Sequence, residues 1–217
     1  MAGELFGLER GQKAVLVLAE VQRRVVMPQY STSPIAAEAQ ARGIVEKIDQ
    51  LARTCRAAGL PVIHVHKWSR PDKGGNFNNC RLSAASNRRP TPDDLDYVLD
   101  SPLDVPASDY VIKRVHGISS FHNTELESIM RYYGAETVIL VGVSTDMNIV
   151  ATSIEAVNRG LNVVVPEDCI AGSSPQVHRT QIDNMLRLLA TITDSGAVTA
   201  ALNCGAHGSE LLMAAGD

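Results

Sequence analysis

The sequence has no surplus of positive charge and few cysteines. Lysine and arginine number 20 against 24 aspartates and glutamates, so the net charge is −4 at pH 7. A protein that binds a phosphate backbone neutralises it with an excess of basic side chains. The composition therefore argues against nucleic acid as a partner.

The four cysteines are too scattered to form a disulfide framework. They are Cys55, Cys80, Cys169 and Cys204. No two of them make a CxxC pair, and none stands near histidines at the spacing of a zinc site. We therefore expect no disulfide scaffold, no metal and no other cofactor. Free thiols are typical of a reducing compartment, so we expect a cytoplasmic protein.

Long apolar runs are also missing. None approaches the ~18 residues that cross a membrane, and the first dozen residues lack the apolar segment of a signal peptide. Hydrophobic residues still make up 45% of the chain and charged residues 20%, which is typical of a folded globular protein. With 217 residues, we expect one domain over 1–217 and no membrane partner.

Short runs rich in β-branched residues alternate with helical patterns. The runs span 14–19, 61–66, 109–113, 137–143 and 162–166. They are typical of strands buried on both faces of a parallel sheet. Apolar stripes at helical spacing lie between them, at 36–58, 124–133, 147–157 and 174–189. We predict an α/β fold: a three-layer, doubly wound, mostly parallel sheet of about six strands with helices on both faces.

The stretch from 68 to 108 interrupts this alternation. It contains five prolines and little periodicity, and it is long for a plain connection, so we expect a functional loop or an oligomer contact. Its basic residues either steer an anionic substrate or form a solvated surface; they are Arg70, Lys73, Arg81, Arg88 and Arg89. The last segment, 203–217, is rich in small residues and is expected to be a loose tail or to pack on a neighbour.

Polar side chains follow the predicted strands at the edge where parallel sheets bind ligands. They include Glu20, Gln22, Trp68, Lys113, Ser144 and Asn148. Glu20 and Lys113 form the most notable pair, because at neighbouring strand ends a lysine lowers the pKa of a carboxylic acid whereas burial raises it. A buried structural ion pair is the other interpretation.

Five motifs in this order resemble the isochorismatase-like family of cysteine hydrolases. They are VLAEVQ at 17–22, SSFHNTEL at 119–126 after Lys113, GVSTDMNIV at 142–150, AVNRG at 156–160 and VVVPEDCIA at 163–171. The resemblance covers residues 12 to 195 and implies a doubly wound parallel sheet and a homodimer or homotetramer. Many members are amidases that use an aspartate, a lysine and a nucleophilic cysteine.

Matched to those motifs, the family's aspartate falls on Glu20, its lysine on Lys113 and its cysteine on Asn148. An amide nitrogen is no nucleophile, because its lone pair is delocalised into the carbonyl, so the thiolate mechanism cannot operate. Cys169 is either a core residue or a thiol that approaches the site from another strand end. We assign substrate contacts to Gln22, Trp68, Phe121, Ser144 and Met147.

Isochorismatases in this family cleave a vinyl ether without a cysteine: a carboxylic acid protonates the enol-ether carbon, and water captures the cation. We therefore predict a hydrolase of a small anionic or carbonyl-containing metabolite. Glu20 supplies acid/base catalysis, Lys113 orients the substrate, and Asn148 binds a substrate oxygen or the attacking water. The alternative is a catalytically silent scaffold that serves as a ligand-binding or assembly subunit.

The resemblance also implies a cis peptide at Val143–Ser144, with the N–H groups of Met147 and Asn148 directed into the pocket. His64 and His66 stand two apart on a predicted strand, so their rings share one face. They are either metal ligands or histidines of a polar pocket or the core. The metal-binding Asp-x-His set of nicotinamidase-like relatives has no counterpart in 67–72, which favours the second interpretation.

Overall fold

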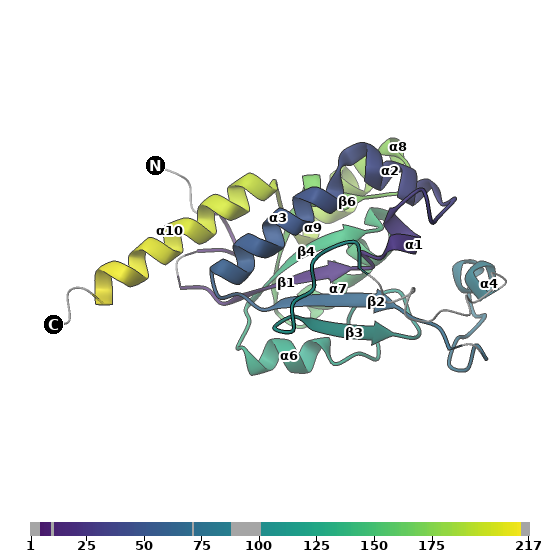
Figure 1. The fold of residues 1–217 in the computed structure, drawn as a ribbon, viewed down its shortest axis with the longest axis horizontal. Coiled ribbons are helices and arrows are strands. Elements are labelled where there is room, and N and C mark those ends of the chain that lie inside the picture. The colour runs from purple at the N-terminus through teal and green to yellow at the C-terminus, as the bar shows by residue number, and fades with distance from the viewer. Residues whose placement is uncertain (1–4, 10, 71, 88–100, 214–217) are drawn as a thin grey trace.

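A single parallel sheet organises the computed structural model, which describes residues 5–9, 11–70, 72–87 and 101–213 (Figure 1). Its strand order is β3-β2-β1-β4-β5-β7, and β6 pairs with the end of β4. Every recorded strand pair is parallel. Because the chain steps outward from β1 in both directions, its crossovers place helices on both faces. The predicted α/β fold is confirmed.

The five predicted strands are present, with ends that differ by at most one residue. They are β1 (Ala14–Ala19), β2 (Val62–Lys67), β3 (Tyr110–Arg114), β4 (Thr137–Val143) and β5 (Asn162–Pro166). Two further strands, β6 (Ile170–Ala171) and β7 (Thr191–Thr193), bring the number of strands in the described part of the chain to seven. Strands of two or three residues are too short to show a periodic pattern, which is why the sequence does not indicate them.

Within the described residues, four helices cover one face of the sheet. They are α1 (Arg23–Val26), α2 (Pro34–Arg42), α3 (Ile44–Ala57) and α10 (Ser195–Met213). The predicted helical stripe at 36–58 is two helices, because Gly43 adopts a left-handed conformation (φ 61°) between them. Helix α10 packs on α3 and runs on beyond the sheet (Figure 1). Residues 203–213 are therefore helical, which corrects the loose tail, one of the two alternatives that the sequence left open for this segment.

The other face is covered by α6 (Leu126–Tyr132) and by two longer helical segments. One consists of a π-helical turn, η1 (Thr145–Ile149), followed by α7 (Val150–Asn158). The other consists of α8 (Pro175–Gln181), a second π-helical turn, η3 (Ile182–Leu186), and α9 (Arg187–Leu189). A short 3-10 turn, η2 (Glu167–Cys169), links β5 to β6.

Alternation along β1 connects both layers to the sheet. Leu16 and Leu18 belong to the core under α2 and α3, whereas Val15 and Val17 belong to the core under α6 and α7. All four side chains are fully buried. This two-sided burial explains the continuous apolar runs and leaves polar residues for the strand ends.

Within the predicted irregular stretch 68–108, the structure describes one helix, α4 (Arg81–Asn87). Figure 1 shows α4 standing apart from the sheet, beyond the ends of β2 and β3. Arg88 and Arg89 lie outside the described residues. Among the helices that are described, none is both long enough and apolar enough to span a bilayer.

Candidate active site

Glu20 begins the site at the carboxyl end of β1. Its backbone is left-handed (φ 53°), its N–H donates to the Val65 carbonyl at 2.9 Å, and its own carbonyl accepts from the Gln22 N–H at 2.9 Å. Few residues other than glycine adopt this conformation, and those that do cluster at functional sites. The turn brings the chain out of the sheet and leaves the Glu20 side chain 16% exposed.

Gly142 allows the two central strands to approach one another directly beside Glu20. It pairs with Ala19, the residue before Glu20, and its φ is 107°. A Cβ atom at this position would lie 2.2 Å from the Ala19 carbonyl oxygen. Any side chain here would displace the end of β1, so the position requires glycine.

The cation at Glu20 is Arg114, the last residue of β3. Its Nη2 donates to Glu20 Oε1 and its Nη1 donates to the Gly117 carbonyl, with the side chain 3% exposed. Lys113 is exposed, and its Nζ lies 5.5 Å from the ring centroid of Trp68. Successive strand residues face opposite sides of a sheet. The structure therefore places Arg114 beside Glu20 in the position predicted for Lys113.

Asn148, in η1, reaches the same oxygen of Glu20, so the structure brings these two predicted site residues together. Its Nδ2 donates to Glu20 Oε1 at 3.1 Å, and the residue is only 1% exposed. Its Oδ1 accepts from Ser120 Oγ at 3.0 Å and from Thr152 Oγ1 at 2.7 Å. The sequence did not identify these two hydroxyls as part of the site, although Thr152 follows Asn148 at the i, i+4 spacing that brings helix residues together.

Three of the predicted substrate-binding side chains have other contacts. Gln22 is buried and bonds the backbone of Lys67 twice, through Nε2 to its carbonyl at 3.2 Å and through Oε1 to its N–H at 2.8 Å. Trp68 lies under the Lys113 ammonium. Phe121 is buried in the core, with the Arg159 guanidinium 4.6 Å from its ring centroid. Gln22 and Phe121 therefore shape the site's surroundings from buried positions.

The predicted cis peptide at Val143–Ser144 is present. The Met147 N–H donates to the Ser144 carbonyl at 3.1 Å, closing the turn that leads into η1. This corrects the expectation that the Met147 N–H points into the pocket. The Ser144 carbonyl also accepts from the Ile149 N–H at 3.1 Å, so Ser144 holds the start of η1 through its backbone.

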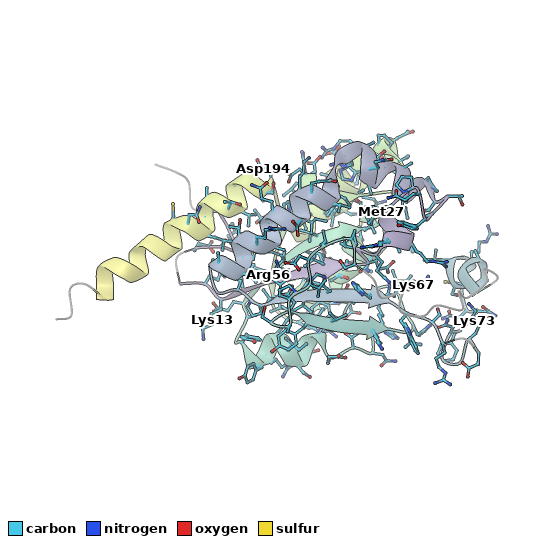
Figure 2. All side chains as sticks on the ribbon, in the orientation of Figure 1. Lys13, Met27, Arg56, Lys67, Lys73 and Asp194 are labelled. Carbon is cyan, nitrogen blue, oxygen red and sulfur yellow. The ribbon has the colours of Figure 1, made fainter. Side chains whose placement is uncertain are left out.

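His64 and His66 lie in the core, with ring centroids 6.0 Å apart. His64 Nε2 is 3.0 Å from Asp109 Oδ2, which also forms a salt bridge with Arg56 near the end of α3 (Figure 2). Burial lowers the pKa of His64 even though the Asp109 carboxylate acts to raise it. Across the described part of the chain, no three His, Cys, Asp or Glu side chains are grouped as a metal would require.

Cys169 and Cys55 are buried thiols. Burial raises the pKa of each to about 12, so both stay protonated at neutral pH. The sequence left two alternatives for Cys169, and the structure places it in the core.

A cavity of about 460 Å³ lies next to the site, between α4, α7 and the loop that follows β3. Gly117 belongs to both the cavity and the Glu20 site, because it lines the cavity and its carbonyl accepts a hydrogen bond from Arg114. Lys67, at the end of β2 nearest α4, also lines it (Figure 2). The volume is that of a small-molecule pocket. Glu20, Arg114 and Asn148 meet one another but do not line this cavity.

Comparisons with known proteins agree with this fold. A family model described as "Isochorismatase domain" matches residues 14–197. The chain is similar to the "Uncharacterized isochorismatase family protein YecD" of Escherichia coli O157:H7, at 28% identity over 69% of this chain and 78% of that protein. It is 25% identical to a "Ureidoacrylate amidohydrolase RutB" of Methylorubrum extorquens, over 74% of this chain and 70% of that protein.

Among solved structures, an isochorismatase family protein from Burkholderia thailandensis superposes with a TM-score of 0.71 at 26% identity. The match covers 88% of this chain and 96% of that chain. The likeness thus extends over most of the length of both chains.

Proposed function

Because the chain belongs to the isochorismatase family of hydrolases, we propose that it hydrolyses a small carbonyl-containing or anionic metabolite by carboxylate acid/base catalysis. Glu20 is the acid/base group and water is the nucleophile. One observation carries the proposal: Arg114 Nη2 and Asn148 Nδ2 both donate to the same oxygen, Oε1, of Glu20. Two donors fix the carboxylate and leave Oε2 for proton transfer, since no described residue has a recorded hydrogen bond to it.

Proton transfer through Oε2 serves two kinds of substrate. With an amide or ureido group, Glu20 takes a proton from water as the water adds to the carbonyl carbon, and returns it to the leaving nitrogen. With a vinyl ether, the protonated carboxyl donates to the enol-ether carbon, and water adds to the resulting cation as it returns a proton to Glu20. The hemiketal then collapses, breaking its C–O bond to give a ketone and an alcohol. Neither route uses a thiol.

Arg114 and Asn148 have separate roles in this mechanism. Arginine stays protonated throughout the reaction, so Arg114 balances the charge of Glu20 and cannot itself shuttle a proton. The Asn148 amide carries two hydrogens, and one is bonded to Glu20. The second donates to a substrate oxygen or to the attacking water.

The substrate class is tested with a panel. One relative is named for ureidoacrylate, so the panel contains ureidoacrylate, amides of short unsaturated acids, carbamoyl compounds, lactones and vinyl ethers. We expect the wild-type protein to turn over one of these classes and Glu20→Gln to lower kcat at least about a hundredfold. The matched control is Glu125→Gln, which changes an exposed glutamate directly before α6 and should keep full activity.

The alternative is a scaffold that binds a ligand without cleaving it. Asn148 in the position of the family's cysteine is the feature that motivates it. Binding of a panel compound without turnover in either wild type or Glu20→Gln would replace the hydrolase with this alternative.

A further inference from the structure

We propose that Ser120 and Thr152 are positioning residues of the Glu20 site, because their hydroxyls hold the Asn148 amide with its nitrogen toward Glu20. The inference rests on the proposed hydrolysis for its effect on rate. Its structural part, the fixed orientation of one amide, can be measured without a substrate.

The orientation of the Asn148 amide follows from the chemistry of its neighbours. An ionised carboxylate offers only acceptors. The Asn148 atom 3.1 Å from Glu20 Oε1 is therefore the nitrogen, since an oxygen there would be repelled. This turns Oδ1 to the opposite side, where the two hydroxyls lie.

Both hydroxyls donate to that oxygen. Ser120 Oγ is 3.0 Å and Thr152 Oγ1 is 2.7 Å from Asn148 Oδ1, so both lone pairs of the amide oxygen are occupied. The Ser120 N–H in turn donates to Thr152 Oγ1 at 2.9 Å. The threonine hydroxyl thus accepts one hydrogen bond and is oriented to give another.

Burial makes the orientation of the Asn148 amide depend on these two hydroxyls. Ser120 and Thr152 are fully buried, and Asn148 is 1% exposed. Water therefore does not replace a lost hydroxyl easily, and an amide oxygen without its donors is left unpaired. The amide can then turn about its last torsion, and Glu20 loses one of the two donors on Oε1.

One loop positions both side chains that donate hydrogen bonds to Glu20. Gly117 accepts the Nη1 hydrogen bond of Arg114, and Ser120, three residues later, donates to Asn148. A His122 ring atom would lie 2.4 Å from a Cβ at Gly117, so the loop is tightly packed there. The segment 117–120 therefore positions both Arg114 and Asn148 at the same carboxylate oxygen of Glu20.

The kinetic test compares variants that remove or retain a hydroxyl. Ser120→Ala and Thr152→Val remove one, and Thr152→Ser retains it. Ser153→Ala is the matched control, because Ser153 is equally buried on the same helix but donates to the Ile149 carbonyl, at 2.8 Å. We expect kcat to fall ten- to a hundredfold in the first two variants with KM nearly unchanged, and little change in the other two. Equal kcat in Thr152→Val and Thr152→Ser would overturn the inference.

A second measurement separates this inference from the proposed function. The Asn148 side-chain proton that is bonded to Glu20, assigned in the nitrogen–proton spectrum by its loss in Asn148→Asp, should exchange slowly with solvent in wild type and in Thr152→Ser. It should exchange faster in Ser120→Ala and Thr152→Val. If the protein hydrolyses nothing but Asn148 is still protected from exchange, the proposed hydrolase function is wrong and the positioning role of Ser120 and Thr152 stands. Exchange that is equal in all variants removes the positioning, whatever the activity.

Discussion

Glu20 and Arg114 are a poorly hydrated ion pair, with side chains 16% and 3% exposed. Removing the cation leaves a carboxylate with neither its partner nor full hydration. We expect Arg114→Met to lower the free energy of unfolding by about 3 kcal/mol in urea denaturation at pH 7. The neighbouring change Lys113→Met removes an exposed side chain that contacts Trp68, and it should cost at most about 1 kcal/mol. Equal losses would contradict the placement of Arg114 at the site.

His178 gives the protein a pH dependence that is independent of Glu20. Burial, with Arg42 as the second cause, lowers the pKa of His178 to about 4. An unfolded chain binds that proton with a pKa of about 6.5. Protonation therefore favours unfolding, so stability should fall as the pH is lowered from about 6.5 to about 4.

The measurement is urea unfolding of wild type and His178→Gln at several pH values. The variant should show a shallower loss of stability between pH 6.5 and 4, and above pH 7 the two curves should run parallel. Some slope remains, because burial lowers the pKa of His64 in the same direction. Identical slopes in the two proteins would show that His178 does not contribute.

At the scale of single residues, the structure brings the predicted site residues Glu20 and Asn148 together, but it places Arg114 at Glu20 instead of the neighbouring Lys113 that the sequence analysis selected. Lys113 and Arg114 differ by one position, and a shift of one residue moves a side chain to the other face of a strand. The predicted strand, 109–113, ended one residue before β3 does. The sequence alone contained no signal that fixes this register.

Among the elements, β1 and β4 depend most strongly on one glycine. Gly142→Ala would place a methyl group 2.2 Å from the Ala19 carbonyl oxygen, on backbone that cannot move without shifting Glu20. We expect a loss of at least about 3 kcal/mol in stability, or no soluble protein. Gly160→Ala has a positive φ but no atom within 4 Å of the new Cβ, so it should cost about 1–2 kcal/mol. Thermal unfolding of the two variants checks this, and equal shifts would argue against the close approach.

Long elements were predictable and short ones were not. β1 and β4 are buried along their whole length, so their runs of apolar residues match the strand ends in the structure. The division at Gly43 was missed because a single glycine scarcely alters an apolar stripe of more than twenty residues. The π-helical turn that carries Asn148 has no sequence signature of its own.

For the whole molecule, strand order decides which side chains meet. β2 separates β3 from β1, so Arg114 and Glu20 come from strands about 10 Å apart, at roughly 4.8 Å per strand spacing. Two long side chains are needed to bridge that distance. The alternation of strands and helices predicted a parallel sheet, but it did not fix the order of the strands, and the pairing of Arg114 with Glu20 follows from that order.

The four cysteines allow the proposed water nucleophile to be tested on the intact protein. Cys80 and Cys204 are exposed, whereas Cys55 and Cys169 are buried. Hydrogen bonding to Ser83 lowers the pKa of Cys80, whereas the buried thiols have a pKa of about 12. Iodoacetamide at pH 7.5, followed by mass spectrometry, should therefore modify Cys80 well before Cys55 or Cys169.

Hydrolysis should survive this modification, because no step of the proposed mechanism uses a thiolate. Cys80→Ser should remove the rapid modification and leave kcat and KM at their wild-type values. Inactivation that follows modification of Cys169 would instead identify a thiol nucleophile and would exclude water as the attacking group. Inactivation that Cys80→Ser prevents would locate the reacting substrate in the 460 Å³ cavity that Cys80 lines, away from Glu20.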